Sequence, residues 1–162
     1  MGESLEEVEA SVIETISTIE GWMNGVKLQI AHHKTEVLLV SNCKPIQRTE
    51  IDVGGHAIST KRTLKLLGVM IDNRLNFNCH VDYACEKSAK AIHAITSIMP
   101  NVGGPKSSTK RLLASVSSSI LRYGAPAWGT ALKTKRSREQ LNRAFRLMVI
   151  RVTSVYRTIS PE

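Results

Sequence analysis

The chain has 162 residues, of which 42% are hydrophobic and 22% are charged, which suits one ordinary globular domain or two small subdomains. This composition excludes disorder along the whole chain. No membrane partner is expected, because the longest apolar run, Val37–Val40, is far shorter than the roughly 18 residues that a spanning helix needs. The three cysteines form no Cys-x-x-Cys pair and no signal peptide is evident, so we expect a reduced, intracellular protein.

The net charge of +8 is distributed unevenly along the chain. Residues 1–25 contain six Glu and no Lys or Arg, which gives −6, whereas residues 101–162 contain twelve Lys or Arg against two acids, which gives +10. A basic C-terminal part of this kind indicates contact with a polyanion. A solvated basic surface explains the charge alone equally well.

A long amphipathic helix is predicted over residues 3–24. Ser4-Leu5-Glu6-Glu7 has the Ser-x-x-Glu pattern of a capping box, and apolar residues then recur in steps of three and four as far as Met23. Asn24-Gly25 comes next, and it supplies the left-handed conformation that commonly ends a helix.

Short β-strands are predicted after this helix. Leu28 and Ile30 alternate with polar neighbours, His32-His33 are typical of a turn with solvated side chains, and residues 35–40 form a β-branched run. Because both positions of Gly54-Gly55 tolerate positive φ, they predict a hairpin between strands at 51–53 and 56–58.

A further strand is predicted over residues 64–71, with Gly68 inside it as a bulge or a close approach of the backbone. From residue 77 onward the periodicity is helical. One helix ends before Pro100, a second is interrupted near Gly124, and a third opens at a second capping-box pattern, Ser137-Arg138-Glu139-Gln140. The sequence therefore predicts an α+β protein with one helix and short antiparallel strands at residues 1–75 and about three helices at 76–162.

The sequence contains no recognisable catalytic set and no metal site. Its aspartates, Asp52, Asp72 and Asp82, have no acidic neighbours, whereas two-metal phosphoryl transfer needs clustered carboxylates that hold ions roughly 3.5–4 Å apart. Lys34 precedes the β-branched run, where its ammonium could meet a phosphate, but spacing alone favours an ordinary surface lysine. A dense basic cluster precedes the third helix: Lys133, Lys135, Arg136 and Arg138.

Six stretches, taken in order, resemble the reverse transcriptases of non-long-terminal-repeat retrotransposons, especially the insect elements that insert into ribosomal genes. They resemble the palm helix after the catalytic hairpin, motif D, the primer grip, and the thumb together with the segment C-terminal to it. The stretches are 4–9 with 22–25, 25–37, 64–72, 99–105, 123–128 and 151–158. Two departures are Val26 for the usual leucine and Leu67 for a common aromatic residue.

The resemblance implies a partial palm at residues 1–75 and a helical thumb at 76–162, the template–primer-binding part of an RNA-directed DNA polymerase. Lys34 would be the motif D lysine near the phosphates of the incoming nucleotide, and Gly68 would hold the primer end through its backbone. Basic residues would track the backbone of the template and primer: Lys106, Lys110, Arg111, Lys133, Lys135, Arg136, Arg138, Arg143 and Arg146.

The implied partners are an RNA template, an RNA–DNA hybrid or DNA primer, and the fingers and remaining palm of a parent polymerase located in the nucleus. The family's metal-binding aspartates are absent here, so the chain itself is expected to be inactive and without a cofactor, although the complete parent enzyme would use Mg²⁺. The alternative is a non-enzymatic, transposon-derived protein that binds nucleic acid or serves as a scaffold.

Overall fold

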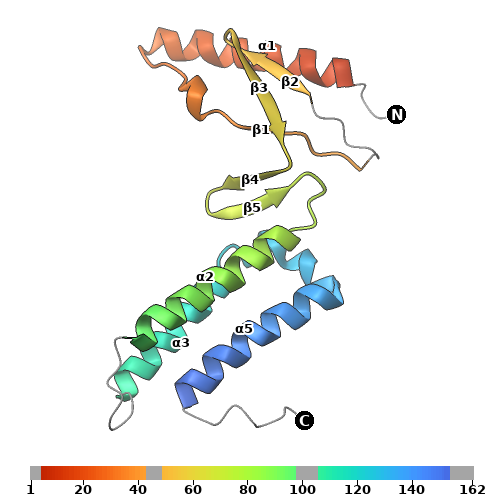
Figure 1. Cartoon of the computed structure of the whole chain (residues 1–162). Coiled ribbons are helices and arrows are strands. Elements are labelled where there is room, and N and C mark those ends of the chain that lie inside the picture. Colours follow the sequence, from red (N-terminus) through yellow and green to blue (C-terminus); the bar gives the residue numbers. More distant parts are fainter. Residues whose placement is uncertain (1–4, 43–48, 98–105, 154–162) are drawn as a thin grey trace. The chain divides into compact units, whose positions relative to one another are not determined.

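The computed structural model describes residues 5–42, 49–97 and 106–153, so Ser4 of the predicted capping box and most of the stretches at 99–105 and 151–158 lie outside the described residues. The chain divides into two compact units, residues 1–64 and 65–162 (Figure 1). The fold class is α+β, as the sequence predicted. The assignment of residues 1–75 to a palm and 76–162 to a thumb stays a prediction.

The first unit places a long helix beside a small sheet. Helix α1 spans Leu5–Gly25, and the strands are β1 (Val37–Leu38), β2 (Glu50–Val53) and β3 (His56–Lys61). The strand order is β1-β3-β2, in which β3 is antiparallel to β2 but parallel to β1, so the prediction of antiparallel strands is wrong for that pair. Alternate residues of β2 are buried, and α1 packs against this strand.

The segment between α1 and β2 differs from its prediction. Residues 26–31 form no strand, because Lys27 adopts a left-handed φ of 59° and its N–H bonds the carbonyl of Asn24. A 3₁₀ turn, η1 (His32–Lys34), comes next, and only two residues of the β-branched run pair as a strand. The hairpin around Gly54-Gly55 is confirmed, with Val53 opposite His56.

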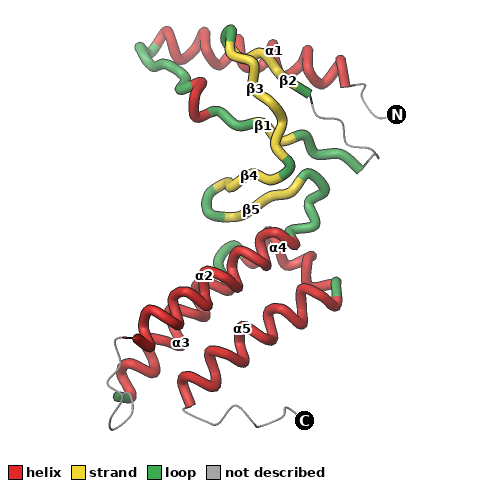
Figure 2. The backbone as a smooth tube through the Cα atoms, viewed as in Figure 1, coloured by secondary structure: helices red, strands yellow, loops and turns green. Residues whose placement is uncertain are grey.

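The second unit begins with a two-stranded hairpin whose first strand starts at the border between the units. Strands β4 (Thr63–Leu66) and β5 (Val69–Asp72) are joined by Leu67 and Gly68 (Figure 2), whose φ angles are 46° and 86°. Two successive positive φ values are typical of the turns that favour glycine or asparagine. The prediction of one strand with Gly68 inside it is therefore wrong, because this residue occupies the turn.

Helices follow the hairpin in the described part of the second unit: α2 (Asn78–Ser97), α3 (Ser107–Arg122), α4 (Ala125–Trp128), the 3₁₀ turn η2 (Gly129–Lys133) and α5 (Lys135–Thr153). Helices α2, α3 and α5 pack against one another around a core of Val81, Leu121, Trp128, Ala131 and Leu141. No helix among the described residues has the length and apolar character needed to cross a membrane.

Two polar residues fix the loops that orient these helices. The Asp72 carboxylate accepts hydrogen bonds from the backbone N–H groups of Arg74, Asn76 and Phe77, at 2.9, 3.1 and 2.6 Å, which holds the loop between β5 and α2. Thr134 caps α5, because its Oγ1 accepts the N–H of Ser137 at 3.3 Å. The predicted cap at Ser137 is therefore wrong by one turn.

Candidate nucleic-acid interface

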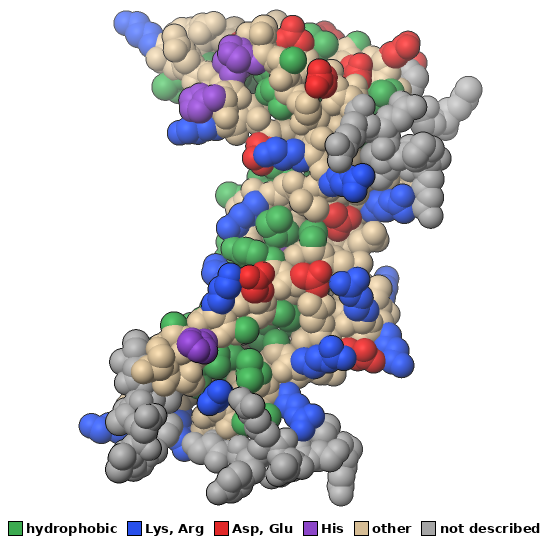
Figure 3. Space-filling model, viewed as in Figure 1, with side chains coloured by type: hydrophobic (Ala, Val, Ile, Leu, Met, Phe, Trp, Pro, Cys, Tyr) green, Lys and Arg blue, Asp and Glu red, His purple; other side chains and the backbone are tan. Residues whose placement is uncertain are grey.

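Helix α5 carries most of the predicted basic residues, and all of these side chains are exposed. Helical spacing places Arg136, Arg143 and Arg146 on the side of the helix opposite the buried Leu141. Lys and Arg outnumber acids on the face of the helical unit shown in Figure 3. The positive charge counted in the sequence therefore lies on the surface of the second unit.

Acidic neighbours reduce the charge of the cluster before α5. Lys135 lies 3.9 Å from Glu139, and Arg136 lies 3.6 Å from Asp82 of α2. These pairs are exposed and therefore contribute little stability, but each lowers the local positive potential. Within the described part of the chain, no such ion pair involves Lys133 or Arg138, and both side chains are exposed.

The remaining predicted basic residues lie at the start of α3. Lys106 precedes the first turn, and the N–H of Lys110 bonds its carbonyl at 3.1 Å. Lys106 and Arg111 are exposed, and Lys110 is half-buried. Because α3 packs beside α5, both groups of cations belong to the same three-helix unit.

Gly68 is held against the helices by Tyr123. A Cβ atom on Gly68 would lie 2.9 Å from Cε1 of the Tyr123 ring, and the Tyr123 hydroxyl donates a 2.8 Å hydrogen bond to the carbonyl of Leu67. The close approach predicted for this glycine is therefore present, although its cause is the turn. Leu67 is 84% exposed, so the turn presents an apolar side chain to solvent.

A cleft of about 320 Å³ opens beside Gly68 between the hairpin and helices α2 and α3. Lys65 of β4 and Tyr83 and Lys87 of α2 line it, and Lys65 Nζ lies 2.9 Å from the Tyr83 hydroxyl. The ammoniums of Lys65 and Lys87 lie 4.9 and 5.8 Å from the centroid of the Tyr83 ring. The hydrogen bond from Lys65, together with the charges of both lysines, lowers the pKa of Tyr83.

His80 forms a buried part of the cleft lining. Its Nδ1 accepts the N–H of Met70 at 3.2 Å, which places the proton of the neutral ring on Nε2. Burial lowers the pKa of His80, and the carbonyl of Tyr123 opposes this shift in part. Nε2 is buried and has no partner within hydrogen-bonding geometry among the described residues.

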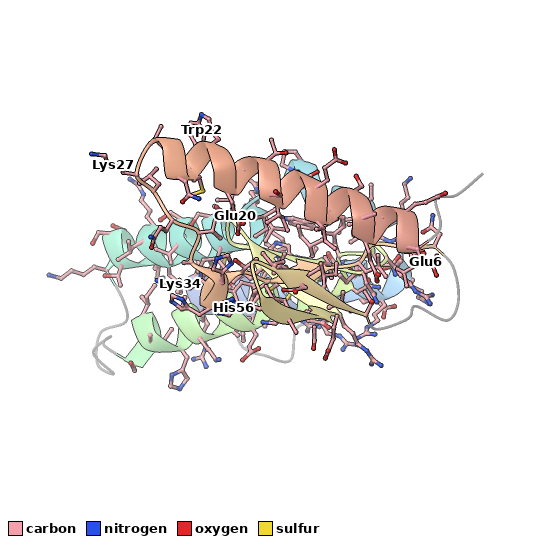
Figure 4. The ribbon with its side chains drawn as sticks, turned by 90° about the horizontal axis from the view of Figure 1, so that it is seen from above. Glu6, Glu20, Trp22, Lys27, Lys34 and His56 are labelled. Carbon is pink, nitrogen blue, oxygen red and sulfur yellow. The ribbon has the colours of Figure 1, made fainter. Side chains whose placement is uncertain are left out.

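Lys34 lies in the first unit, at the end of η1 (Figure 4), and its side chain is exposed. Within η1, the His32 side chain makes contacts that the prediction of two solvated histidines did not include. The His32 ring stacks on His56 with centroids 5.0 Å apart, and its Nε2 lies 3.7 Å from a Glu20 carboxylate oxygen. The prediction of a solvated side chain is therefore wrong for His32. The exposed position of Lys34 fits both a lysine that meets a ligand and an ordinary surface lysine.

The structure thus gathers the predicted nucleic-acid-binding residues, including Gly68, into the second unit and leaves Lys34 in the first. The sequence alone did not single out four residues of the cleft: Lys65, Tyr83, Lys87 and His80. Lys65 is three residues before Gly68, and Tyr83 and Lys87 are four residues apart on one helix face, so spacing alone could have paired the latter two. Their approach to Lys65 depends on tertiary packing.

Comparison with known proteins indicates the origin of the chain. No protein-family model matches it, and no solved structure matches it. The chain is 27% identical, over 143 residues, to a retrovirus-related Pol polyprotein from type-1 retrotransposable element R1 of Bradysia coprophila. The match covers 87% of this chain but only 14% of that polyprotein. This similarity supports a retrotransposon-related origin.

Proposed function

We propose that the chain is the template–primer-binding part of a retrotransposon reverse transcriptase, with a palm remnant followed by a thumb. The similarity to the Pol polyprotein over 87% of the chain carries this proposal. The ordered motifs of the sequence and the basic surface of the three-helix unit support it. In this assignment, Lys34 is the motif D lysine and acts in the complete enzyme as a proton donor to the pyrophosphate leaving group.

Nucleic-acid binding by this unit would be directed at phosphates. The exposed cations on α3 and α5 would contact phosphates, and such contacts supply affinity without sequence information. RNA templates, primers and their hybrids would share this surface. The fingers and remaining palm of the parent polymerase, together with Mg²⁺, would supply the chemistry.

The chain by itself is expected to incorporate no nucleotide. Asp72 is committed to three backbone N–H groups, and Asp82 is paired with Arg136. Primer extension on an RNA template with Mg²⁺ should therefore match a heat-denatured control. Template-dependent incorporation above that control would contradict the assignment of catalysis to residues outside this chain.

A salt titration of the full chain against an RNA–DNA hybrid tests the binding proposal. Neutralising three or four phosphates should give a slope of log K against log salt near −3, with a Kd of roughly 10⁻⁴–10⁻⁶ M at physiological salt. Changing the α5-side cations Lys133, Lys135, Arg136 and Arg138 to Gln should flatten the slope and weaken binding. The matched control removes the same number of charges from the first unit by changing Lys27, Lys44, Lys61 and Arg62 to Gln.

If the quadruple variant keeps the affinity and the slope of the parent chain, the basic surface of α5 is only solvated and the proposal is wrong. An equal loss in the first-unit control would also contradict it, because the binding would then depend on total charge rather than on the three-helix unit.

A further inference from the structure

The cleft beside Gly68 combines three features that no requirement of the fold explains. Two exposed ammoniums, those of Lys65 and Lys87, converge on one tyrosine. No acidic side chain lines the cleft, and no ion pair in the described residues involves either lysine. Two cations that line one cleft without a counter-charge repel each other, and an anion bound between them would offset this repulsion.

The buried wall of the cleft adds no negative charge. His80 is a buried residue of this wall, and its neutral ring accepts the Met70 N–H at Nδ1 and carries its proton on Nε2, on which the Tyr123 carbonyl acts. The cleft therefore presents donors and positive charge, which is the chemistry that recognises an oxyanion.

Tyr83 positions the cations rather than neutralising them. Its hydroxyl lies 2.9 Å from Lys65 Nζ and its ring lies near both ammoniums, so cation–π attraction holds both lysines at the lining of the same cleft. The volume of about 320 Å³ admits a phosphate group with an attached sugar. Gly68 also lines the cleft.

We propose that Lys65 and Lys87, held by Tyr83, form a phosphate-binding site in this cleft. The phosphate belongs to a nucleic-acid strand that crosses the three-helix unit, and the alternative source is a free phosphate compound. The identity of the strand rests on the proposed function, whereas the existence of the phosphate site does not.

The first arm of the test uses the full chain and inorganic phosphate. A phosphate that draws Lys65 away should raise the pKa of the Tyr83 phenol, which Lys65 otherwise lowers. The phenol is monitored by ultraviolet absorbance, with Tyr83→Phe subtracted to remove the other tyrosines. A matched chloride titration at equal ionic strength measures the effect of screening alone.

Phosphate, but not chloride, should raise the pKa of Tyr83 in the parent chain and in Lys90→Gln, and should have no such effect in Lys65→Gln or Lys87→Gln. Lys90 is the matched control because it lies on α2 and pairs with Glu86 outside the cleft. Equal shifts with chloride and phosphate, or the same response in the Lys87→Gln variant, would overturn the site.

The second arm measures binding of the RNA–DNA hybrid. If both lysines contact one phosphate, each single change to Gln should weaken binding about three- to tenfold. The double variant should lose clearly less than the product of the two single losses, because the residues share a partner. The slope against log salt should fall by about 0.9, the value for one phosphate.

The two arms separate the possible failures. A phosphate-specific shift of Tyr83 with unchanged hybrid affinity would keep the phosphate site and assign it to a free phosphate compound. If the α5 variants lose hybrid binding but Lys65→Gln and Lys87→Gln do not, the proposed function stands. The assignment of the bound phosphate to a nucleic-acid strand is then wrong. Thermal unfolding should be unchanged in Lys65→Gln and Lys87→Gln, since both side chains are exposed.

Discussion

Gly68→Ala is the substitution whose effect can be worked out most fully from the structure. Alanine at φ 86° costs about 1–2 kcal/mol, because its Cβ crowds the backbone in the left-handed region. That Cβ would also lie 2.9 Å from the Tyr123 ring and force it to move. Displacing the ring endangers the hydrogen bond to Leu67, which is worth roughly 0.5–1.5 kcal/mol. We expect a total loss of about 2–3 kcal/mol in the free energy of unfolding.

Gly129→Ala is the matched control in the same unit. Its φ is −55°, and a Cβ there would meet nothing within 4 Å, so the change should be neutral or stabilise by about 0.4–1 kcal/mol. Urea unfolding monitored by the fluorescence of buried Trp128, in a Trp22→Phe background, reports on this unit.

A second background separates strain from the clash. In Tyr123→Leu, which lacks the ring and the hydroxyl, Gly68→Ala should cost only the left-handed strain of about 1–2 kcal/mol. If Gly68→Ala instead costs no more than Gly129→Ala, the turn and its support by Tyr123 are not what holds this hairpin in place.

Two further predictions concern the loop after this hairpin and the two thiols of α2. Asp72→Ala should lower the free energy of unfolding by about 1–3 kcal/mol in urea titrations, because three backbone N–H groups lose their acceptor, whereas Asp52→Ala on the exposed side of β2 should have a small effect. Burial raises the pKa of the Cys79 and Cys85 thiols, so in a Cys43→Ser background both should react with iodoacetamide more slowly in the folded chain than in urea; equal rates would contradict this assignment.

The sequence predicted well the features that depend on local periodicity. Helix α1 and the helical second half are predicted by apolar residues at three- and four-residue steps, and the β2–β3 hairpin by Gly54-Gly55. These predictions succeed because the signal and the structure lie within the same few residues.

The predictions from sequence fail where a residue distant in the chain or an unusual backbone conformation determines the local structure. Leu67 adopts positive φ against the preference of a leucine, so Gly68 alone did not reveal a two-residue turn after β4. Thr134 rather than Ser137 caps α5, since Ser137 instead donates from Oγ to Asn78, 59 residues away, at 3.0 Å. The pairing of β1 with β3 likewise has no local signature.

In the candidate site, too, the features set by the local sequence were predicted and those set by tertiary contacts were not. Composition predicted a basic C-terminal part, and the structure places most of those cations on the packed helices α3 and α5. Composition could not predict that Asp82 and Glu139 would pair with part of the α5 cluster, or that Lys65 and Lys87 would meet at Tyr83. The charge count therefore pointed to the second unit. In the described residues, only the packing reveals that Lys65 and Lys87 meet without an acidic partner.

Stability of the helical unit should depend on pH through His80. Burial lowers the pKa of this imidazole below the ordinary value of about 6.5 that it has in the unfolded chain. Between the two values the unfolded chain binds more protons, so the free energy of unfolding should fall as the pH drops below about 6.5 and stop falling below the folded pKa. Protonation also converts Nδ1 from an acceptor into a donor that faces the Met70 N–H.

Two measurements test this linkage. The imidazole of His80, monitored by NMR in the full chain, should titrate with a midpoint below that of an unfolded histidine. Urea unfolding monitored at Trp128 in the Trp22→Phe background, between about pH 5 and 8, should lose less stability toward acid in His80→Asn. Asparagine is chosen because its Oδ1 can replace Nδ1 as the acceptor for Met70, so the hydrogen bond is kept while the titration is removed. His93→Asn, on the exposed side of α2, is the control and should retain the pH dependence. A midpoint at or above that of the unfolded histidine would show that the ring is accessible to water and protons in the folded unit, and the neutral Nε2–H assigned to the cleft would then be wrong.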